Sequence, residues 1–366
     1  MIRLILLGLL SGAFFSSTFV LNELMSAAGG HWFWSASLRY VFMLLLLTAM
    51  IAVQHGMGRI KELWTIFCQH IGFWCITGSI GFGLFYTGIC YAGDHASGWV
   101  VAATFMFTVV TSLLVLLAFG QRFDKKFIVY ALIVFVGVVL VNISEGLHAP
   151  ADTNAIPLTQ MLLYGALPAL IAAFSYPIGN QLVWQASYNA KQHKIKEQDS
   201  QQQAQPMRAE TALLASAHDT ADTHSTQHDT TGSSTLQTLI GRIPVIDTDL
   251  LQNAFNKVWL MTVGSLPFWL VLGIIVRPEL PGGAQVFNTL LVALLSGVAA
   301  TSLFLYAREQ AVTSSEVAGV DSTQASEIIF ALIGGMILLD NPLPSILGLV
   351  GIVLIIIGLI LFAKDG

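Results

Sequence analysis

The stretch ILGLVGIVLIIIGLILFA, residues 346–363, contains neither a charged nor an amide side chain. A helix rises about 1.5 Å per residue, so this stretch nearly covers a hydrocarbon core of about 30 Å. Nine earlier stretches are similarly long and apolar, and we therefore expect an all-α polytopic membrane protein with ten spans. The expected spans are 4–24, 33–53, 71–91, 98–119, 127–143, 162–183, 258–276, 286–306, 318–339 and 346–363.

The overall composition supports the same class of protein. Hydrophobic residues make up 55% of the 366 residues and charged residues only 10%, against about 25% charged residues in soluble domains. The three cysteines, Cys68, Cys75 and Cys90, do not form a CxxC pair, so we interpret them as packing residues. We expect the lipid bilayer as surroundings, no nucleic acid partner, no metal and no cofactor.

The basic residues predict how the chain is threaded. Lys and Arg in short loops stay on the cytoplasmic side of a membrane. With a cytoplasmic N-terminus, every basic residue except Arg39 and Arg277 falls on that side. We therefore expect a multi-pass protein of the bacterial plasma (inner) membrane with both termini in the cytoplasm. Residues 1–30 have the pattern of a signal peptide, but we expect this segment to be retained as the first span.

An offset of about 220 residues superimposes the fourth and fifth spans on the ninth and tenth, with Tyr86 on Tyr306. This predicts two five-helix repeats: residues 1–145, and residues 160–186 together with 257–366. Because five is odd, the repeats must enter the membrane in opposite senses. Inverted repeats of this kind are typical of transporters that work by alternating access.

The segment 187–250, between the sixth and seventh spans, is polar and rich in Gln, His, Thr and Asp. It has too few large apolar residues to form a core, so we predict a disordered cytoplasmic linker. The stretch HDTADTHSTQHD, residues 218–229, would at most bind a divalent metal weakly, because its spacings match no structural zinc site. We favour a solvated tether.

The ninth span carries the most deeply placed acid of the chain, Glu327. An ionised group at mid-bilayer costs about 2.5–3.5 kcal/mol on insertion scales, so it needs a reason. Asp321, Gln324 and Glu327 recur every three residues and share one side of a helix. Because burial favours the neutral form of a carboxylate, Glu327 and Asp321 are candidates for proton coupling and Gln324 for substrate binding. A permanently paired structural acid is the alternative.

Polar and aromatic residues near the outer ends of the first two spans form a second group of candidates. Arg39 and Glu23 are placed at a similar depth, and an ion pair between them would form an extracellular gate or a static contact. Asn22 and Trp34 adjoin them, although Trp34 also fits an interfacial anchor. Tyr86 and Tyr306 are further aromatic candidates for substrate binding, with core packing as the alternative.

Four strings resemble the multidrug resistance efflux transporter family of the drug/metabolite transporter (DMT) superfamily. They are GGHWFWSASLRY (29–40), AAFSYPIGNQ (172–181), GSLPFW (264–269) and DSTQASEIIFALIGG (321–335). The resemblance implies ten helices in two inverted halves, with spans one to four and six to nine around a cavity and spans five and ten at the margin. It also implies roles in substrate binding or coupling for the residues in these strings, namely Arg39, Tyr176, Asn180, Gln324 and Glu327. Glu23 departs from the family pattern, in which a basic residue often follows the asparagine, and the long linker is atypical.

These observations favour a secondary transporter that exports small organic molecules, drugs or metabolites, by proton antiport and alternating access. One alternative is a non-transporting scaffold or sensor that acts through its linker. An intramembrane enzyme is a third reading, but the sequence has no GxSxG nucleophile and no clear acid pair, so we expect no enzyme. A homodimer is compatible with the sequence, which leaves the oligomeric state and the substrate open.

Overall fold

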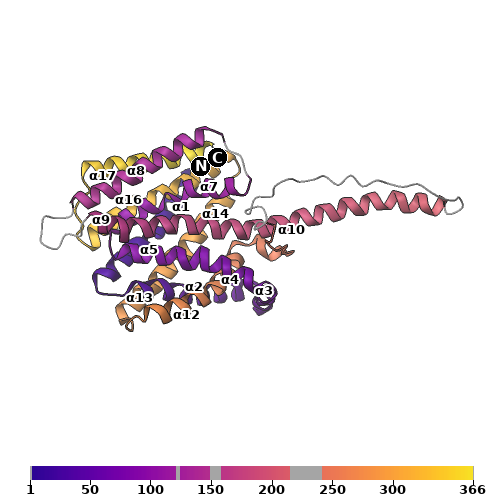
Figure 1. Ribbon diagram of the computed structural model, residues 1–366, viewed down its shortest axis with the longest axis horizontal. Helices are drawn as coiled ribbons and strands as arrows, with labels where there is room; N and C mark the ends of the chain where they lie inside the picture. The colour runs from indigo at the N-terminus through magenta and orange to yellow at the C-terminus, as the bar shows by residue number, and fades with distance from the viewer. Residues whose placement is uncertain (1, 121–123, 149–157, 215–240, 366) are drawn as a thin grey trace.

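The structure is a computed structural model that describes residues 2–120, 124–148, 158–214 and 241–365. These residues form helices and connecting turns and contain no strand (Figure 1). Nine described helical stretches are long and apolar enough to cross a membrane, which confirms an all-α polytopic membrane protein. They are Ile2–Ala27, Trp32–His55, Ile71–Gly93, Gly98–Ala118, Lys126–Leu147, Leu158–Ala190, Ala254–Val276, Gly283–Glu309 and Ile346–Asp365.

The expected ninth span is not one continuous helix. It consists of α15 (Ser314–Ser322), the 3-10 turn η5 (Thr323–Ala325) and α16 (Ser326–Leu338). Serine and threonine hydroxyls in this stretch bond to carbonyls three residues earlier, as Thr323 does to Val320 and Ser326 to Thr323. Such local bonds compete with regular helix geometry. The interruption therefore contains Gln324 and lies between Asp321 and Glu327.

Three other spans are also irregular near their middle. The third span is α4 (Ile71–Gly78), the π-helical η1 (Ser79–Leu84) and α5 (Phe85–Gly93). The eighth is α13 (Gly283–Val292), the π-helical η4 (Ala293–Ala300) and α14 (Thr301–Glu309). The fourth is divided into α6 (Gly98–Phe105) and α7 (Thr108–Ala118). Spans three, four, eight and nine thus carry interruptions, and such features are frequent at functional sites.

Helix α10 corrects part of the linker prediction. After the short α9 (Leu158–Met161) and η2 (Leu162–Ala166), it runs from Leu167 to Leu214 and projects far from the bundle (Figure 1). The linker was expected to begin at residue 187, yet the helix continues because this stretch is rich in Ala, Gln, Glu and Lys, which favour helix. Residues 215–240, with the His/Asp stretch, lie outside the described residues.

A second difference is α3 (Met57–Gln69), which lies between α2 (Trp32–His55) and α4 and was not expected. Leu63 and Phe67, four residues apart, are its buried residues, whereas most of its other side chains are exposed or half-buried. That spacing places both on one face of the helix. The second loop is therefore partly helical rather than a simple connection.

The helices pack in a pattern that is similar for the two halves of the chain. Helix α1 (Ile2–Ala27) contacts α16, η4 and α14, and α10 makes the matching contacts with α7, η1 and α5. Helices α8 (Lys126–His148) and α17 (Ile346–Asp365) pack extensively against each other and lie together along one side of the bundle (Figure 1). Helix α12 (Ala254–Val276) packs on α4, where Gly78 and Gly264 allow the backbones to approach closely.

Both ends of the chain lie at the same end of the bundle. Leu4 packs with Ala307 and Val320 near the N-terminus. Asp365, near the C-terminus, lines a cavity together with Arg308, which follows Ala307 in the chain. An even number of membrane crossings is the simplest threading that places both ends together, and the interrupted α15–α16 segment supplies the tenth crossing.

Candidate functional site

A cavity of about 350 Å³ lies among α1, α2, the irregular spans and α10. That volume falls within the range of small-molecule pockets. Each interruption contributes a lining residue: Phe82 from η1, Met106 between α6 and α7, Ser296 from η4 and Gln324 from η5. Of the residues singled out in the sequence, five line this central cavity: Arg39, Tyr176, Asn180, Gln324 and Glu327.

Most of the wall of the central cavity is apolar and aromatic. Phe85 lies with its ring centroid 5.1 Å from that of Tyr176 and 5.3 Å from that of Phe105. On another side, Tyr40 stacks on Phe82 with centroids 5.2 Å apart. Ring pairs at these separations are favourable packing contacts. The cavity therefore offers a molecule an apolar surface with few polar attachment points.

Arg39 is the cation of the central cavity, and it is 8% exposed. Its Nη2 donates a hydrogen bond to Ser296 Oγ at 3.1 Å, and its guanidinium carbon lies 4.1 Å from the centroid of the Tyr86 ring. Ser296 also accepts from Thr18 Oγ1 at 2.7 Å, and Asn22 Nδ2 donates to the Tyr86 hydroxyl at 3.3 Å. Tyr86 thus contacts Arg39 directly and Asn22 holds Tyr86 in place, and neither residue lines the cavity itself.

Glu327 is the acid of the central cavity and is also 8% exposed. It lies in the first turn of α16, directly after η5, where the helix dipole favours a carboxylate. Among the described residues, the structure records no hydrogen bond or ion pair for the Glu327 side chain. Glu327 is therefore a buried acid that no basic side chain holds permanently.

The ion pair expected between Glu23 and Arg39 is not formed. The Glu23 carboxylate instead accepts from the Gly98 backbone N–H and from Asn341 Nδ2, both at 2.7 Å. These bonds join the end of α1 to the first residue of α6 and to the turn before α17. The prediction of this pairing is wrong for the described structure, because Arg39 is directed toward Ser296 and Tyr86 instead.

Asp321 is separate from the central cavity. Its carboxylate lies 3.3 Å from Arg308 Nη2, and both line a neighbouring cavity of about 860 Å³. This inner cavity shares Met106, Phe304 and Gln324 with the central cavity. The two cavities therefore adjoin, and the inner one leads toward the end of the bundle that carries both termini.

Trp34 and Tyr306 also lie away from the central cavity. Trp34 Nε1 donates to the backbone oxygen of Glu279 at 2.5 Å, which ties α2 to the α12–α13 connection. Tyr306 is 43% exposed on α14 and does not line the cavity. The match of Tyr306 with the buried Tyr86 in the offset sequence therefore does not extend to their surroundings.

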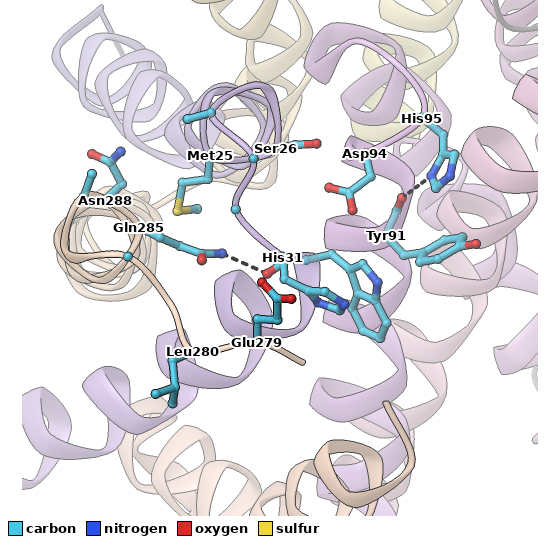
Figure 2. A pocket seen from close by; sticks show the side chains of 16 residues that line it. Met25, Ser26, His31, Tyr91, Asp94, His95, Glu279, Leu280, Gln285 and Asn288 are labelled. Carbon is cyan, nitrogen blue, oxygen red and sulfur yellow. Dashed lines mark hydrogen bonds between the residues drawn. The ribbon is translucent and has the colours of Figure 1, made fainter. Parts of the chain in front are cut away.

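A third cavity, of about 780 Å³, lies at the opposite end of the bundle from the termini. Figure 2 shows its side chains, with Gln285 donating to the His31 backbone oxygen at 2.8 Å and His95 contacting that of Tyr91. Burial raises the pKa of Asp94 here, partly offset by Ser26, His95 and His31. This outer cavity has no lining residue in common with the central one, so the two cavities are separate in the described structure.

Sequence reasoning missed several residues of the central cavity. Ser296 was not singled out, although it is the hydroxyl to which both Arg39 and Thr18 donate. The rings of Phe82, Phe85 and Phe105 were also missed, because Phe is common in every span. A signal for Ser296 was present, since it is a lone hydroxyl within the apolar run LLVALLSGVAA.

Two relatives and a solved structure match most of the chain. A relative in Bacillus subtilis (strain 168), "Uncharacterized protein YjlA", is 28% identical over 375 aligned positions, covering 98% of this chain and 94% of the relative. A relative in Shouchella clausii, "Uncharacterized 42.1 kDa protein in intracellular alkaline protease 3'region", is 29% identical over 320 positions, covering 84% of this chain and 65% of the relative. A solved structure described as "Crystal structure of protein" shares the fold, with a TM-score of 0.52 at 12% identity, and covers 99% of this chain and 98% of its own.

The match to a family model is the most informative comparison. The model described as "Putative multidrug resistance efflux transporter" matches residues 2–365. This confirms the resemblance given by the four strings, and it identifies a family of transporters, not of enzymes. The chain therefore belongs to the multidrug resistance efflux transporter family, as a multi-pass membrane efflux transporter of the DMT type.

Proposed function

We propose that this transporter exports small organic molecules through the central cavity by proton-coupled alternating access, with Glu327 as the proton-carrying residue. The observation that carries the proposal is a buried carboxylate without a fixed cation partner in the wall of an aromatic cavity. Intramembrane acids that face a cavity are the usual means of proton coupling. Arg39, Tyr176, Asn180 and Gln324 would contact the substrate, whereas Asn22 and Tyr86 would position Arg39.

The two halves of the chain would act as inverted repeats, residues 1–145 and residues 160–186 with 257–366. The matching contacts of α1 and α10 support this, as do the interruptions in spans three, four, eight and nine. Discontinuous helices in corresponding positions of two repeats are typical of transporter binding sites. The cavities that adjoin on the side of the termini fit a conformation open toward that side.

The side of the termini would be the cytoplasm of a bacterial cell, since basic residues gather there. Asp321, paired with Arg308 at the inner cavity, would then line the entrance for substrate and protons. Glu23, held by Gly98 and Asn341, would keep the outer side closed. A homodimer remains compatible with this arrangement and is not required by it.

The test is transport by purified protein in vesicles with an imposed pH gradient, measured with a fluorescent hydrophobic dye. The wild type should move dye against its own gradient while protons flow in the opposite direction. Glu327→Gln should abolish this gradient-driven flux, because the amide cannot release a proton. The matched control is Glu309→Gln, since Glu309 is exposed at the end of α14 and lines no described cavity.

Dye flux in Glu327→Gln that equals that of the wild type, with the same response to pH, would rule out the coupling role. The scaffold alternative is tested alongside by deleting residues 195–240. A transporter should retain flux after this deletion, whereas a protein that acts only through its linker has no flux to retain. No described observation favours the scaffold.

A further inference from the structure

A side cavity of about 410 Å³ lies between α7, α10 and α12. It shares Tyr176, Asn180, Ala254 and Val258 with the central cavity, so the two adjoin along one wall. The proposed export cycle uses the central and inner cavities and assigns nothing to this side cavity. Its chemistry therefore has to be explained separately.

Two hydrogen-bond donors without partners characterise the side cavity. Gln181 is only 9% exposed, and its Nε2 has no acceptor in the structure. Lys257 lines the same cavity, and no hydrogen bond or ion pair is recorded for its ammonium among the described residues. A buried donor without an acceptor is unfavourable, because it has lost its hydrogen bonds to water. Gln181 is such a donor, whereas Lys257 is half-buried. An unpaired amide beside an unpaired ammonium in one cavity indicates an acceptor that comes from outside the chain.

The charge of the missing group follows from the surroundings. Lys257 lies in the first turn of α12, where the amide ends of the helix are already positive. A cation at that position is unfavourable unless an anion joins it. None of the residues that line the side cavity is an Asp or a Glu. The missing group is therefore anionic and rich in acceptor oxygens, as a carboxylate or a phosphate is.

Part of the lining is apolar and reaches the surface of the bundle. Val115 and Leu116 of α7 and Trp184 of α10 line the side cavity, and Trp184 is 45% exposed. Leu117, the next residue of α7, is 56% exposed on the bundle surface. Beyond the shared wall, the aromatic rings of the central cavity continue the apolar surface. A ligand that suits both cavities thus has an anionic head and an apolar body.

We infer that the side cavity binds the head of a single-chain anionic amphiphile from the inner leaflet, with Lys257 and Gln181 holding the head and the central cavity receiving the tail. This inference rests on the proposed export function and names a substrate class for it. It also assigns a specificity-determining role to two residues outside the central cavity.

The experiment measures equilibrium binding to protein in nanodiscs of zwitterionic lipid at fixed pH, without any gradient. The probes are decanoate, decyl phosphate, butyrate and decyltrimethylammonium. Decanoate and decyl phosphate should bind, butyrate should bind at least tenfold more weakly for lack of a tail, and decyltrimethylammonium should not compete. Lys257→Met should weaken decanoate binding about tenfold or more, because a charge-assisted hydrogen bond is lost. Gln181→Leu should weaken it severalfold, and Lys257→Arg should largely restore it.

The matched control is Lys125→Met, which removes an exposed lysine that lines no described cavity. Melting temperatures of all variants verify that they remain folded. Equal binding of the cation and the anion, or unchanged binding in Lys257→Met, would overturn the inference. If binding of decyl phosphate is inhibited by phosphatidylglycerol in the nanodiscs but not by decanoate, the site binds a lipid headgroup. This result would also overturn the inference. Because binding needs no gradient, a failure here is distinct from a failure of dye export.

Discussion

The contact between Arg39 and Ser296 provides a quantitative test of the central cavity. Ser296→Ala removes the acceptor of the Arg39 bond at 3.1 Å and of the Thr18 bond at 2.7 Å. A hydrogen bond to a charged group contributes about 1.5–3 kcal/mol and a neutral one about 1 kcal/mol. Arg39 faces a cavity in which water can replace part of the lost contact. We therefore expect a loss of about 2 kcal/mol in the free energy of unfolding.

The assay is reversible unfolding by increasing denaturant in mixed micelles, followed by circular dichroism. The matched control is Ser265→Ala, because Ser265 is also fully buried but donates only to the Thr262 carbonyl of its own helix. That substitution should cost less than about 1 kcal/mol. If Ser296→Ala and Ser265→Ala differ by less than about 0.5 kcal/mol, Ser296 does not anchor Arg39 and the geometry assigned to the site is incorrect.

Two further predictions concern packing and pH. Gly264→Ala should lower the free energy of unfolding by about 1–3 kcal/mol, because a Cβ there meets the Trp74 backbone of α4. The control is Gly282→Ala, where a Cβ meets nothing within 4 Å. Equal melting temperatures of the two variants would contradict the close crossing of α4 and α12. Asp94→Asn should raise the melting temperature at pH 7, since burial raises the pKa of Asp94 and its contribution to stability is lost as pH rises. The gain should vanish below about pH 4, where the carboxyl is protonated in both states, and a gain that is independent of pH would refute this account.

Much of the membrane architecture was predictable because the length of an apolar stretch reports directly on the thickness of the bilayer. Arg39, Gln324 and Glu327 could be named in advance, since polar groups inside apolar spans are costly and stand out in the sequence. Tyr176 and Asn180 could be named only from the family resemblance. All five line the central cavity. The likeness of the four strings then indicated the family, which the match over residues 2–365 confirms.

The partners of these residues were not predictable to the same degree. Glu23 bonds to Gly98 and Asn341, which are 75 and 318 positions away in the chain, so only the folded structure brings them together. Tyr306 matches Tyr86 in the offset sequence, yet Tyr306 is exposed on α14 whereas Tyr86 is buried on α5. The interruption in the ninth span likewise depends on hydroxyl groups that a hydropathy average does not detect.

The interruptions in spans three, four, eight and nine have a mechanical consequence. A continuous helix resists bending along its length, whereas a span divided near its middle can change direction through a few backbone dihedral angles. Each interrupted turn also contributes a residue to the same cavity wall. A small rotation at any one of them would therefore move contacts around a bound molecule, while α8 and α17 keep their mutual packing at the edge of the bundle.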